Sequence, residues 1–258
     1  MRRERGRPHW GGRFQLGIGQ ALYVGPAFDT TPHAHHALQL CIALDGTFAL
    51  RGPGRARWRR YAAALVAADH PHQLSGEGRT VCVLYLEPES ARGRRLETVL
   101  DGRGLIDLTP RARSLRGPLT VLRDASATDR LAEAAQAILD SLSGIVHEPR
   151  ALDPRITNAV GFLRAARGEY PSSAALGRRL GCSTGRFRHL FREQVGIGYR
   201  SYLLWLKVAG AADELLRGAS LTTAAHAAGF SDSAHLARVF RRMFGLAPSQ
   251  APPFRVRS

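Results

Sequence analysis

Cysteine is scarce in this chain of 258 residues, where Cys41, Cys82 and Cys182 are odd in number and far apart. This spacing offers neither a disulfide framework nor a paired-cysteine metal site, so we expect buried, free thiols in a reducing compartment. No run of about 20 apolar residues is present, and no apolar segment of signal length follows the basic N-terminus. We therefore expect a cytoplasmic protein without a membrane partner.

Acidic residues are also few. The 21 Asp and Glu residues are outnumbered by 36 Arg and one Lys, Lys207, which gives a formal net charge of +16. Residues 150–258 hold 17 basic and 6 acidic side chains, whereas residues 1–149 hold 20 and 15. Such an excess favours a polyanionic partner, and it is concentrated in the C-terminal part of the chain.

The N-terminal part contains short runs with strand-type alternation, separated by turn residues. These runs are residues 14–23, 38–44, 47–51, 62–67 and 80–86. Several short strands in succession predict a small antiparallel barrel or sandwich. The dipeptide Asp45-Gly46 predicts a hairpin between two of the strands.

Helical spacing follows in residues 89–100 and 129–142. In the second segment, one apolar stripe contains Leu131, Ala135, Ile138 and Leu142. We interpret this stripe as packing against the domain's own sheet, and a seam between two subunits of a homodimer is the alternative.

A segment without an apolar period then separates the two parts of the chain. It contains Gly144 and Pro149, and Asp153-Pro154 after it has the sequence of a helix start. We expect an α+β protein with two domains. Residues 1–143 form the first domain, 144–153 a linker, 154–251 an all-α domain and 252–258 a tail.

A repeat marks the all-α domain. The segment 191–196, Phe-Arg-Glu-Gln-Val-Gly, returns 49 residues later as Phe-Arg-Arg-Met-Phe-Gly in residues 240–245. In each copy a short helix, a turn glycine and a polar cap precede a longer helix, which predicts two helix-turn-helix units. The longer helices are expected at 184–195 and 233–244, and one long helix over 199–216 would hold them at a fixed separation. The residues of this long helix expected to face the core are Tyr202, Leu206, Ala209, Leu215 and Leu216.

The outward faces of these two longer helices carry residue types that bind DNA. Arginine makes bidentate bonds to guanine or to phosphate, and histidine donates to base acceptors. We predict base contacts for Arg188 and Arg238. The candidate DNA-binding residues are Thr184, Gly185, Arg188, His189 and Arg192 in the first helix, and Ser233, Ala234, Ala237, Arg238, Arg241 and Arg242 in the second. Taken alone, an arginine-rich helix face can also be simply solvated.

The spacing of these residues resembles the AraC/XylS family of bacterial transcription regulators. The pattern Ser183-x3-Phe187-x3-Phe191-x4-Gly196 is followed by Gly-Phe-Ser-Asp at 229–232 and by Phe240-x4-Gly245-x2-Pro-Ser. The resemblance covers about residues 152–250. It implies a sequence-specific regulator with double-stranded DNA and a small-molecule effector as partners, and no enzymatic activity. One departure is Gly185, where the family usually presents a larger side chain.

A histidine-rich segment at residues 32–39 is the second informative feature. On a strand, His33, His35, Gln39 and Cys41 would share one face. The spacing His33-x-His35-x3-Gln39-x6-Gly resembles the first cupin motif, and Asp-x2-His72 resembles a degraded second one. The resemblance implies a cupin-like antiparallel β-barrel with flanking helices as the effector-sensing domain.

The role of this histidine segment has three interpretations. His33, His35, Gln39 and His72 are candidate effector-binding residues. Three imidazoles also suit a first-row transition ion, with His33, His35 and His72 as the candidate metal ligands. A neutral amide at Gln39 is a poor ligand, however, so we expect no metal or other cofactor. The third interpretation is a set of structural histidines satisfied by hydrogen bonds.

Two alternative functions remain beside a ligand-responsive regulator. The first is a cupin-type metal-dependent enzyme fused to a DNA-binding domain, against which Gln39 argues. The second is a non-specific nucleic-acid binder, which would bind all sequences with nearly equal affinity. Paired recognition helices instead predict a specific site with two contacted segments.

Overall fold

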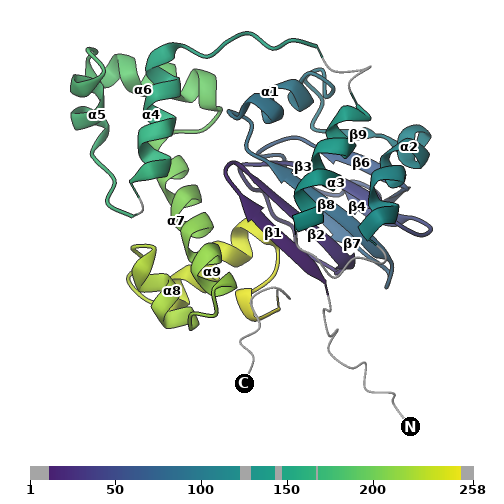
Figure 1. The fold of residues 1–258 in the computed structure, drawn as a ribbon. Helices are drawn as coiled ribbons and strands as arrows, with labels where there is room; N and C mark the ends of the chain where they lie inside the picture. The colour runs from purple at the N-terminus through teal and green to yellow at the C-terminus, as the bar shows by residue number, and fades with distance from the viewer. Residues whose placement is uncertain (1–11, 123–128, 143–146, 167, 251–258) are drawn as a thin grey trace.

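The computed structural model describes residues 12–122, 129–142, 147–166 and 168–250 (Figure 1). A domain of strands and short helices comes first, and a helical domain lies against one side of it. Within the described ranges, no helix combines the length and the apolar character that a membrane crossing needs.

The N-terminal domain contains two antiparallel sheets. The order of the six-stranded sheet is β1-β2-β8-β3-β6-β9, and that of the three-stranded sheet is β5-β4-β7. The strands are β1 Arg13–Gly17, β2 Gln20–Pro26, β3 Leu38–Ala43, β4 Phe48–Arg51, β5 Arg59–Tyr61, β6 Ala63–Val66, β7 Gln73–Ser75, β8 Thr80–Leu86 and β9 Leu105–Asp107.

The two faces of the six-stranded sheet pack into different cores. Leu40 and Ile42 of β3 face a core shared with helices α1 (Ala91–Glu97), α2 (Ala112–Arg116) and α3 (Asp129–Asp140). The alternate residue Cys41 faces the three-stranded sheet. This two-residue period explains how β3 is buried on both of its faces. Two short 3₁₀ helices, Thr109–Arg111 and Gly117–Leu122, flank α2.

The predicted barrel is not closed in the described residues. The two sheets face each other as an open sandwich, and no ladder joins β1 or β9 of the larger sheet to the smaller one. The β1–β2 edge turns instead toward the C-terminal domain, as Figure 1 shows. The fold class is otherwise as predicted, because antiparallel strands with flanking helices precede an all-α domain.

The hairpin predicted at Asp45-Gly46 is wrong. Strand β3 pairs with β6 and β8, whereas β4 pairs with β5 and β7, so the turn carries the chain from one sheet to the other. The turn chemistry itself is present, because Gly46 has a positive φ of 56° and Asp45 Oδ1 accepts a hydrogen bond from the Thr80 N–H. A turn sequence permits a sharp bend but does not choose the partner strand.

Other differences concern short strands. The segment predicted as one strand over 14–23 is the hairpin β1–β2, in which Gly17 pairs with Gln20. The strands β5, β7 and β9 were not predicted, because three residues are too few to show alternation.

The apolar stripe of α3 packs inside the domain. Ala135, Ile138 and Leu142 are buried in the core shared with the sheet, as the packing interpretation predicts, and the side chain of Leu131 lies outside the described residues. Residues 147–153 of the predicted linker form no helix or strand, whereas 144–146 and the tail 252–258 lie outside the described residues. Cys41 and Cys82 are buried free thiols, but Cys182 is only half-buried.

The C-terminal domain is a set of helices around two small cores. Its helices are α4 Pro154–Ala165, α5 Ser173–Arg179, α6 Thr184–Val195, α7 Tyr199–Leu216, α8 Leu221–Ala227, α9 Ser233–Phe244 and a 3₁₀ turn, Pro248–Gln250. As predicted, α4 begins at a cap in which the Asp153 carboxylate accepts from the Arg155 N–H. Helix α7 contributes Tyr202 to the first core and Val208 to the second, so it is shared by both helix-turn-helix units.

Candidate nucleic-acid interface and interdomain cavity

The first helix-turn-helix unit consists of α5 and α6. Ser172 caps α5 by accepting a hydrogen bond from the Ala175 N–H, and Ser183 caps α6 by accepting one from the Arg186 N–H. Such caps determine where each helix begins. Phe187 is fully buried against α5 and α7, so the opposite side of α6 faces solvent.

The predicted contact residues of α6 lie on this solvent side. Thr184 is half-buried, and the exposed ones are Gly185, Arg188, His189 and Arg192. The Nε of Arg188 donates to the hydroxyl of Ser173 over 2.9 Å. This bond positions the guanidinium at the junction of α5 and α6 and leaves its terminal N–H groups available for an acceptor.

The second unit, α8 and α9, repeats this arrangement. Ser220 caps α8, and Asp232 caps α9 by accepting from the His235 N–H over 2.6 Å. Leu236 and Phe240 are buried behind α9. On the outward face Ser233 and Ala237 are half-buried, and the exposed residues are Ala234, Arg238, Arg241 and Arg242.

The arginine side chains on the outward faces of α6 and α9 are available to bind an anion. In the described part of the chain, no ion pair involves Arg188, Arg192, Arg238, Arg241 or Arg242. Helix α7 spans 18 residues, or roughly 27 Å, as one continuous connection between the units. Both helices therefore present positive charge on a rigid support, which is the arrangement that phosphate and base-edge contacts require.

Helix α7 also shows where the predicted core was incomplete. Tyr202, Leu206 and Leu215 are buried as expected, but Ala209 and Leu216 are only half-buried. The buried residues that were not predicted are Tyr199, Trp205, Val208, Ala211 and Ala212. A helix between two cores and a second domain has more than one apolar stripe, so a single period describes it poorly.

The histidine segment forms a buried cluster in the N-terminal domain. His33 and His72 face each other in an isolated antiparallel bridge, and His35 precedes β3 rather than lying on it. Gln39 Oε1 lies 2.8 Å from His35 Nε2 and 3.2 Å from His72 Nε2, and Gln39 Nε2 is 3.0 Å from Cys41 Sγ. The residues predicted to share a site therefore lie together, although His33 and His35 lie before β3 rather than on a strand.

A second polar cluster, which the sequence did not predict, joins the two domains. Its members are His36, Glu87 and Glu89 of the N-terminal domain and Arg164, Tyr202 and Trp205 of the C-terminal domain. Arg164 bonds both glutamates, Tyr202 donates to Glu89 over 2.9 Å, and Trp205 donates to Glu87 over 2.8 Å. We call these six residues the interdomain network.

The charges of this network follow from its hydrogen bonds. Burial alone would lower the pKa of His36, but its bonds to Asp69 and Glu89 raise it to about 9, so His36 is a cation near neutral pH. Burial would raise the pKa of Glu89, yet His36 and Arg164 lower it. Burial and the neighbouring Glu89 raise the pKa of Glu87. Glu89 thus lies between two cations, His36 of its own domain and Arg164 of the other, and Arg164 is the cation that crosses the domain boundary.

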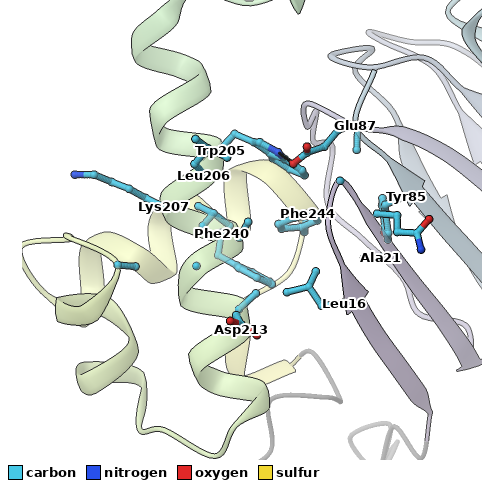
Figure 2. Close-up of a pocket in the computed structure, with 18 of the residues that line it drawn as sticks. Leu16, Ala21, Tyr85, Glu87, Trp205, Leu206, Lys207, Asp213, Phe240 and Phe244 are labelled. Carbon is cyan, nitrogen blue, oxygen red and sulfur yellow. Dashed lines mark hydrogen bonds between the residues drawn. The ribbon is translucent and has the colours of Figure 1, made fainter. Parts of the chain in front are cut away.

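A cavity of about 660 Å³ lies beside the interdomain network, between the six-stranded sheet and the C-terminal domain (Figure 2). Its walls are largely apolar. The sheet contributes Leu16, Ala21, Val83 and Tyr85, and the C-terminal domain contributes Trp205, Leu206, Ala212, Phe240 and Phe244. Glu87 and Arg164 lie at the cavity as part of the network, whereas Figure 2 shows the Lys207 ammonium extending away, where it donates to the Gly229 carbonyl over 2.8 Å.

The predicted effector residues His33, His35, Gln39 and His72 do not line this cavity. The side chains of Tyr85 and Phe244 line it, and they also pack on the His35 ring at centroid distances of 5.3 and 5.7 Å. The cavity and the histidine cluster are therefore neighbours that share a wall. No local pattern in the sequence marks the cavity, because one part of its wall comes from residues 14–87 and the other part from residues 164–246.

Comparisons with known proteins agree with this geometry. A family model described as a helix-turn-helix domain matches residues 176–251. No curated protein matches the sequence. The fold resembles that of an apo ToxT variant from Vibrio cholerae, with a TM-score of 0.63 and 12% identity over 92% of this chain and 97% of that one. It also resembles wild-type ToxT from Vibrio cholerae bound to an unsaturated fatty acid, with a TM-score of 0.57 and 14% identity over 96% of each chain.

The structural likeness and the family-model match cover different parts of the chain. The ToxT likeness shows the fold of both domains together, because it covers nearly the whole of each chain. The helix-turn-helix match covers both recognition helices and the end of the resemblance noted in the sequence. With two capped helix-turn-helix units on one shared helix, the C-terminal part of the chain is a helix-turn-helix domain, and the whole chain has the two-domain fold of ToxT.

Proposed function

We propose that α6 and α9 bind two adjacent major-groove segments of double-stranded DNA, and that a small apolar molecule in the interdomain cavity controls this binding. The observation that carries the proposal is the composition of the cavity wall. The sheet forms one side of the cavity. The other side is formed by α9, which is the second recognition helix, and by α7, which supports it. A molecule in the cavity would therefore change the packing of the sheet against a DNA-binding helix.

The outward faces of α6 and α9 carry different residues, and we expect them to make different contacts with DNA. We assign base contacts to Arg188, which bonds Ser173, and to Arg238, and we assign phosphate contacts to the exposed Arg192, Arg241 and Arg242. The small residues Ala234 and Ala237 beside Arg238 allow close approach to a thymine methyl group. We propose an asymmetric site that each chain reads in one direction.

The chemistry of the cavity favours an apolar effector. A volume of about 660 Å³ is in the range of small-molecule sites, and apolar side chains form most of the wall. The fatty-acid-bound ToxT structure, which shares this fold, supports a long apolar molecule. In the described lining, Arg164 is already paired with two glutamates and the Lys207 ammonium points away, so we expect apolar contacts to dominate the affinity.

An enzyme fused to a DNA-binding domain receives no support from these contacts. His33, His35 and His72 are at most 6% exposed, and Phe244 stacks on the His35 ring, so these histidines do not line an open site. We keep residues 1–143 and 154–251 as the proposed bounds of the sensing and DNA-binding domains. A single chain would bind both DNA segments.

The DNA test is selection of bound fragments from a random duplex pool at fixed salt, followed by hydroxyl-radical footprinting. We expect one enriched sequence with two protected segments about one helical turn apart, roughly 34 Å. An inverted repeat of that whole sequence would show that two chains bind together. Equal binding of selected and random fragments would refute sequence-specific recognition.

The effector test is a thermal-shift screen of apolar small molecules, including unsaturated fatty acids, followed by DNA-binding assays with each molecule that stabilises the protein. Leu16→Trp should fill the cavity and abolish the effect. Gln15→Trp is the matched control, since its side chain lies on the same strand but outside the cavity wall. A molecule that acts equally on both variants binds elsewhere and would overturn the effector site.

A further inference from the structure

Both cations in the described lining of the interdomain cavity already have partners inside the protein. Arg164 bonds the carboxylates of Glu87 and Glu89, and the Lys207 ammonium donates to the Gly229 carbonyl over 2.8 Å. Figure 2 also shows Lys207 pointing away from the cavity. In this lining, no cation is therefore left to pair with a negatively charged ligand.

Carboxylates lie at both ends of the same cavity. Glu87 lies at the end beside the interdomain network, where Trp205 of α7 donates to it. Asp213 and Glu214 also line the cavity, and both bond Arg217. Glu214 is roughly 14 Å beyond Trp205 along the axis of α7. A ligand that carries a carboxylate would therefore meet a carboxylate of the protein at either end, and like charges repel.

The interdomain network is balanced in charge without a ligand. Its two cations, His36 and Arg164, match its two buried carboxylates, Glu87 and Glu89. His36 also bonds Asp69, whose carboxylate is 45% exposed and therefore solvated. Burial and the neighbouring Glu89 raise the pKa of Glu87, so this carboxylate has no positive charge to spare. A ligand carboxylate beside it would be a buried charge without a partner, which is costly.

Two polar groups at this end of the cavity still have hydrogen-bonding capacity. Oε1 of Glu87 accepts from Trp205 Nε1 and Oε2 accepts from Arg164, so each oxygen keeps a lone pair. The Nε of Arg164 is buried and has no acceptor among the described residues. A hydroxyl both donates and accepts, so it suits the carboxylate and this N–H together, whereas a carboxylate only accepts.

We infer that the effector is an uncharged amphiphile with a hydroxyl group, such as a long-chain alcohol, and that Glu87 supplies the carboxylate with which Arg164 pairs. The inference rests on the proposed effector cavity and names the chemistry of its ligand. The apolar chain would lie against Leu16 and Phe244, and the hydroxyl would donate to Glu87. This chain would therefore differ from ToxT, whose structure holds an unsaturated fatty acid.

The test compares four ligands that share one apolar chain, namely oleyl alcohol, methyl oleate, oleylamine and oleic acid. Each is titrated into the full chain at about pH 8, where the acid is ionised, and below the concentration at which it forms micelles. Phenylalanine replaces Trp10 and Trp58, so that the fluorescence comes from Trp205 in the cavity wall. We expect the alcohol to bind at least tenfold more tightly than the acid or the amine, with the ester between them.

Glu87→Gln in this background tests the role of the internal carboxylate. The variant leaves Arg164 with one anion fewer, so the affinity for the acid should rise at least tenfold relative to that for the alcohol. Glu214→Gln is the matched control, because it makes the same chemical change in the wall of the same cavity, away from Arg164. It should keep the order of the four ligands.

The order of the ligands in the background protein decides the inference even if Glu87→Gln does not fold. Tightest binding of the acid or of the amine would overturn an uncharged effector and would leave the effector cavity standing. An unchanged order in a folded Glu87→Gln variant would refute the role of Glu87. Failure of all four ligands to bind would refute the effector cavity itself, and the inference with it.

Discussion

Replacement of Arg164 by methionine is the sharpest test of how the two domains are joined. The Arg164 side chain is 23% exposed, and it bonds Glu87 and Glu89, whose side chains are 9% and 0% exposed. Methionine keeps the aliphatic part of the side chain but removes the cation. Glu87 would then keep only the Trp205 N–H, whereas Glu89 would keep His36 and Tyr202.

The expected cost follows from the carboxylate that is left behind. Removing one partner of a buried ion pair costs about 3 to 5 kcal/mol, and the partial exposure of Arg164 favours the lower end, about 3 kcal/mol. Most of this cost would come from keeping the Glu87 carboxylate buried without a cation beside it. Glu87→Gln in the same protein should therefore recover part of the loss, since a neutral amide needs no cation, and we expect a coupling energy of about 1 to 2 kcal/mol.

Urea unfolding followed by tryptophan fluorescence measures both quantities. Trp205 lies in the interdomain network, and replacing Trp10 and Trp58 by phenylalanine makes it the only tryptophan of the three in the chain. The four proteins of the cycle are the background, the two single variants and the double variant. A loss below about 1 kcal/mol for Arg164→Met, or additivity within about 0.5 kcal/mol, would refute the argument that the network joins the domains.

Other substitutions test the backbone and the DNA-binding faces. Gly245→Ala should destabilise the protein by more than about 2 kcal/mol in thermal unfolding, because φ is 72° and a Cβ would lie 2.5 Å from the backbone oxygen of Thr31 in the N-terminal domain. Gly218→Ala, with φ of 91° but open space, controls for the φ strain alone, and an equal loss in both would contradict the clash. Gly185→Ala should stabilise the protein by up to about 1 kcal/mol, since the position is helical and has no neighbour within 4 Å, and no gain would contradict the propensity argument. Arg238→Ala should cost about 1 to 3 kcal/mol on the selected DNA and relax discrimination at one base pair, whereas Arg192→Ala should weaken all sequences alike. Equal losses on selected and random DNA in gel shifts of Arg238→Ala would contradict its assignment as a base contact.

The helical domain was predictable because its determinants are local. Ser172, Ser183 and Asp232 cap their helices through hydrogen bonds to N–H groups three residues later, and turn glycines follow the short helices. Apolar residues three and four apart then decide which face is buried. All of this information lies within about ten residues of each helix, so α6, α7 and α9 have the bounds that their sequences predict.

The sites between the domains were not predictable in the same way. Glu87 and Glu89 follow an apolar strand, where two acidic residues would ordinarily be read as solvated, and their partner Arg164 is 75 or more residues away. Only the folded chain brings them together. The histidine cluster was found because its residue types are unusual and closely spaced, but the contacts of its Nδ1 atoms with three backbone carbonyls are shown by no sequence pattern.

The two recognition helices also differ in how they are joined to the N-terminal domain. The end of α9 is bonded to Thr31 and stacked on His35, whereas in the described part of the chain no hydrogen bond links α6 to residues 12–142. A ligand can shift an equilibrium only through contacts that differ between the two states. Phe244 of α9 lines the interdomain cavity, so the proposed apolar ligand would act first on α9. The first helix would then provide constant affinity, and control by ligands would fall on the DNA segment that α9 reads.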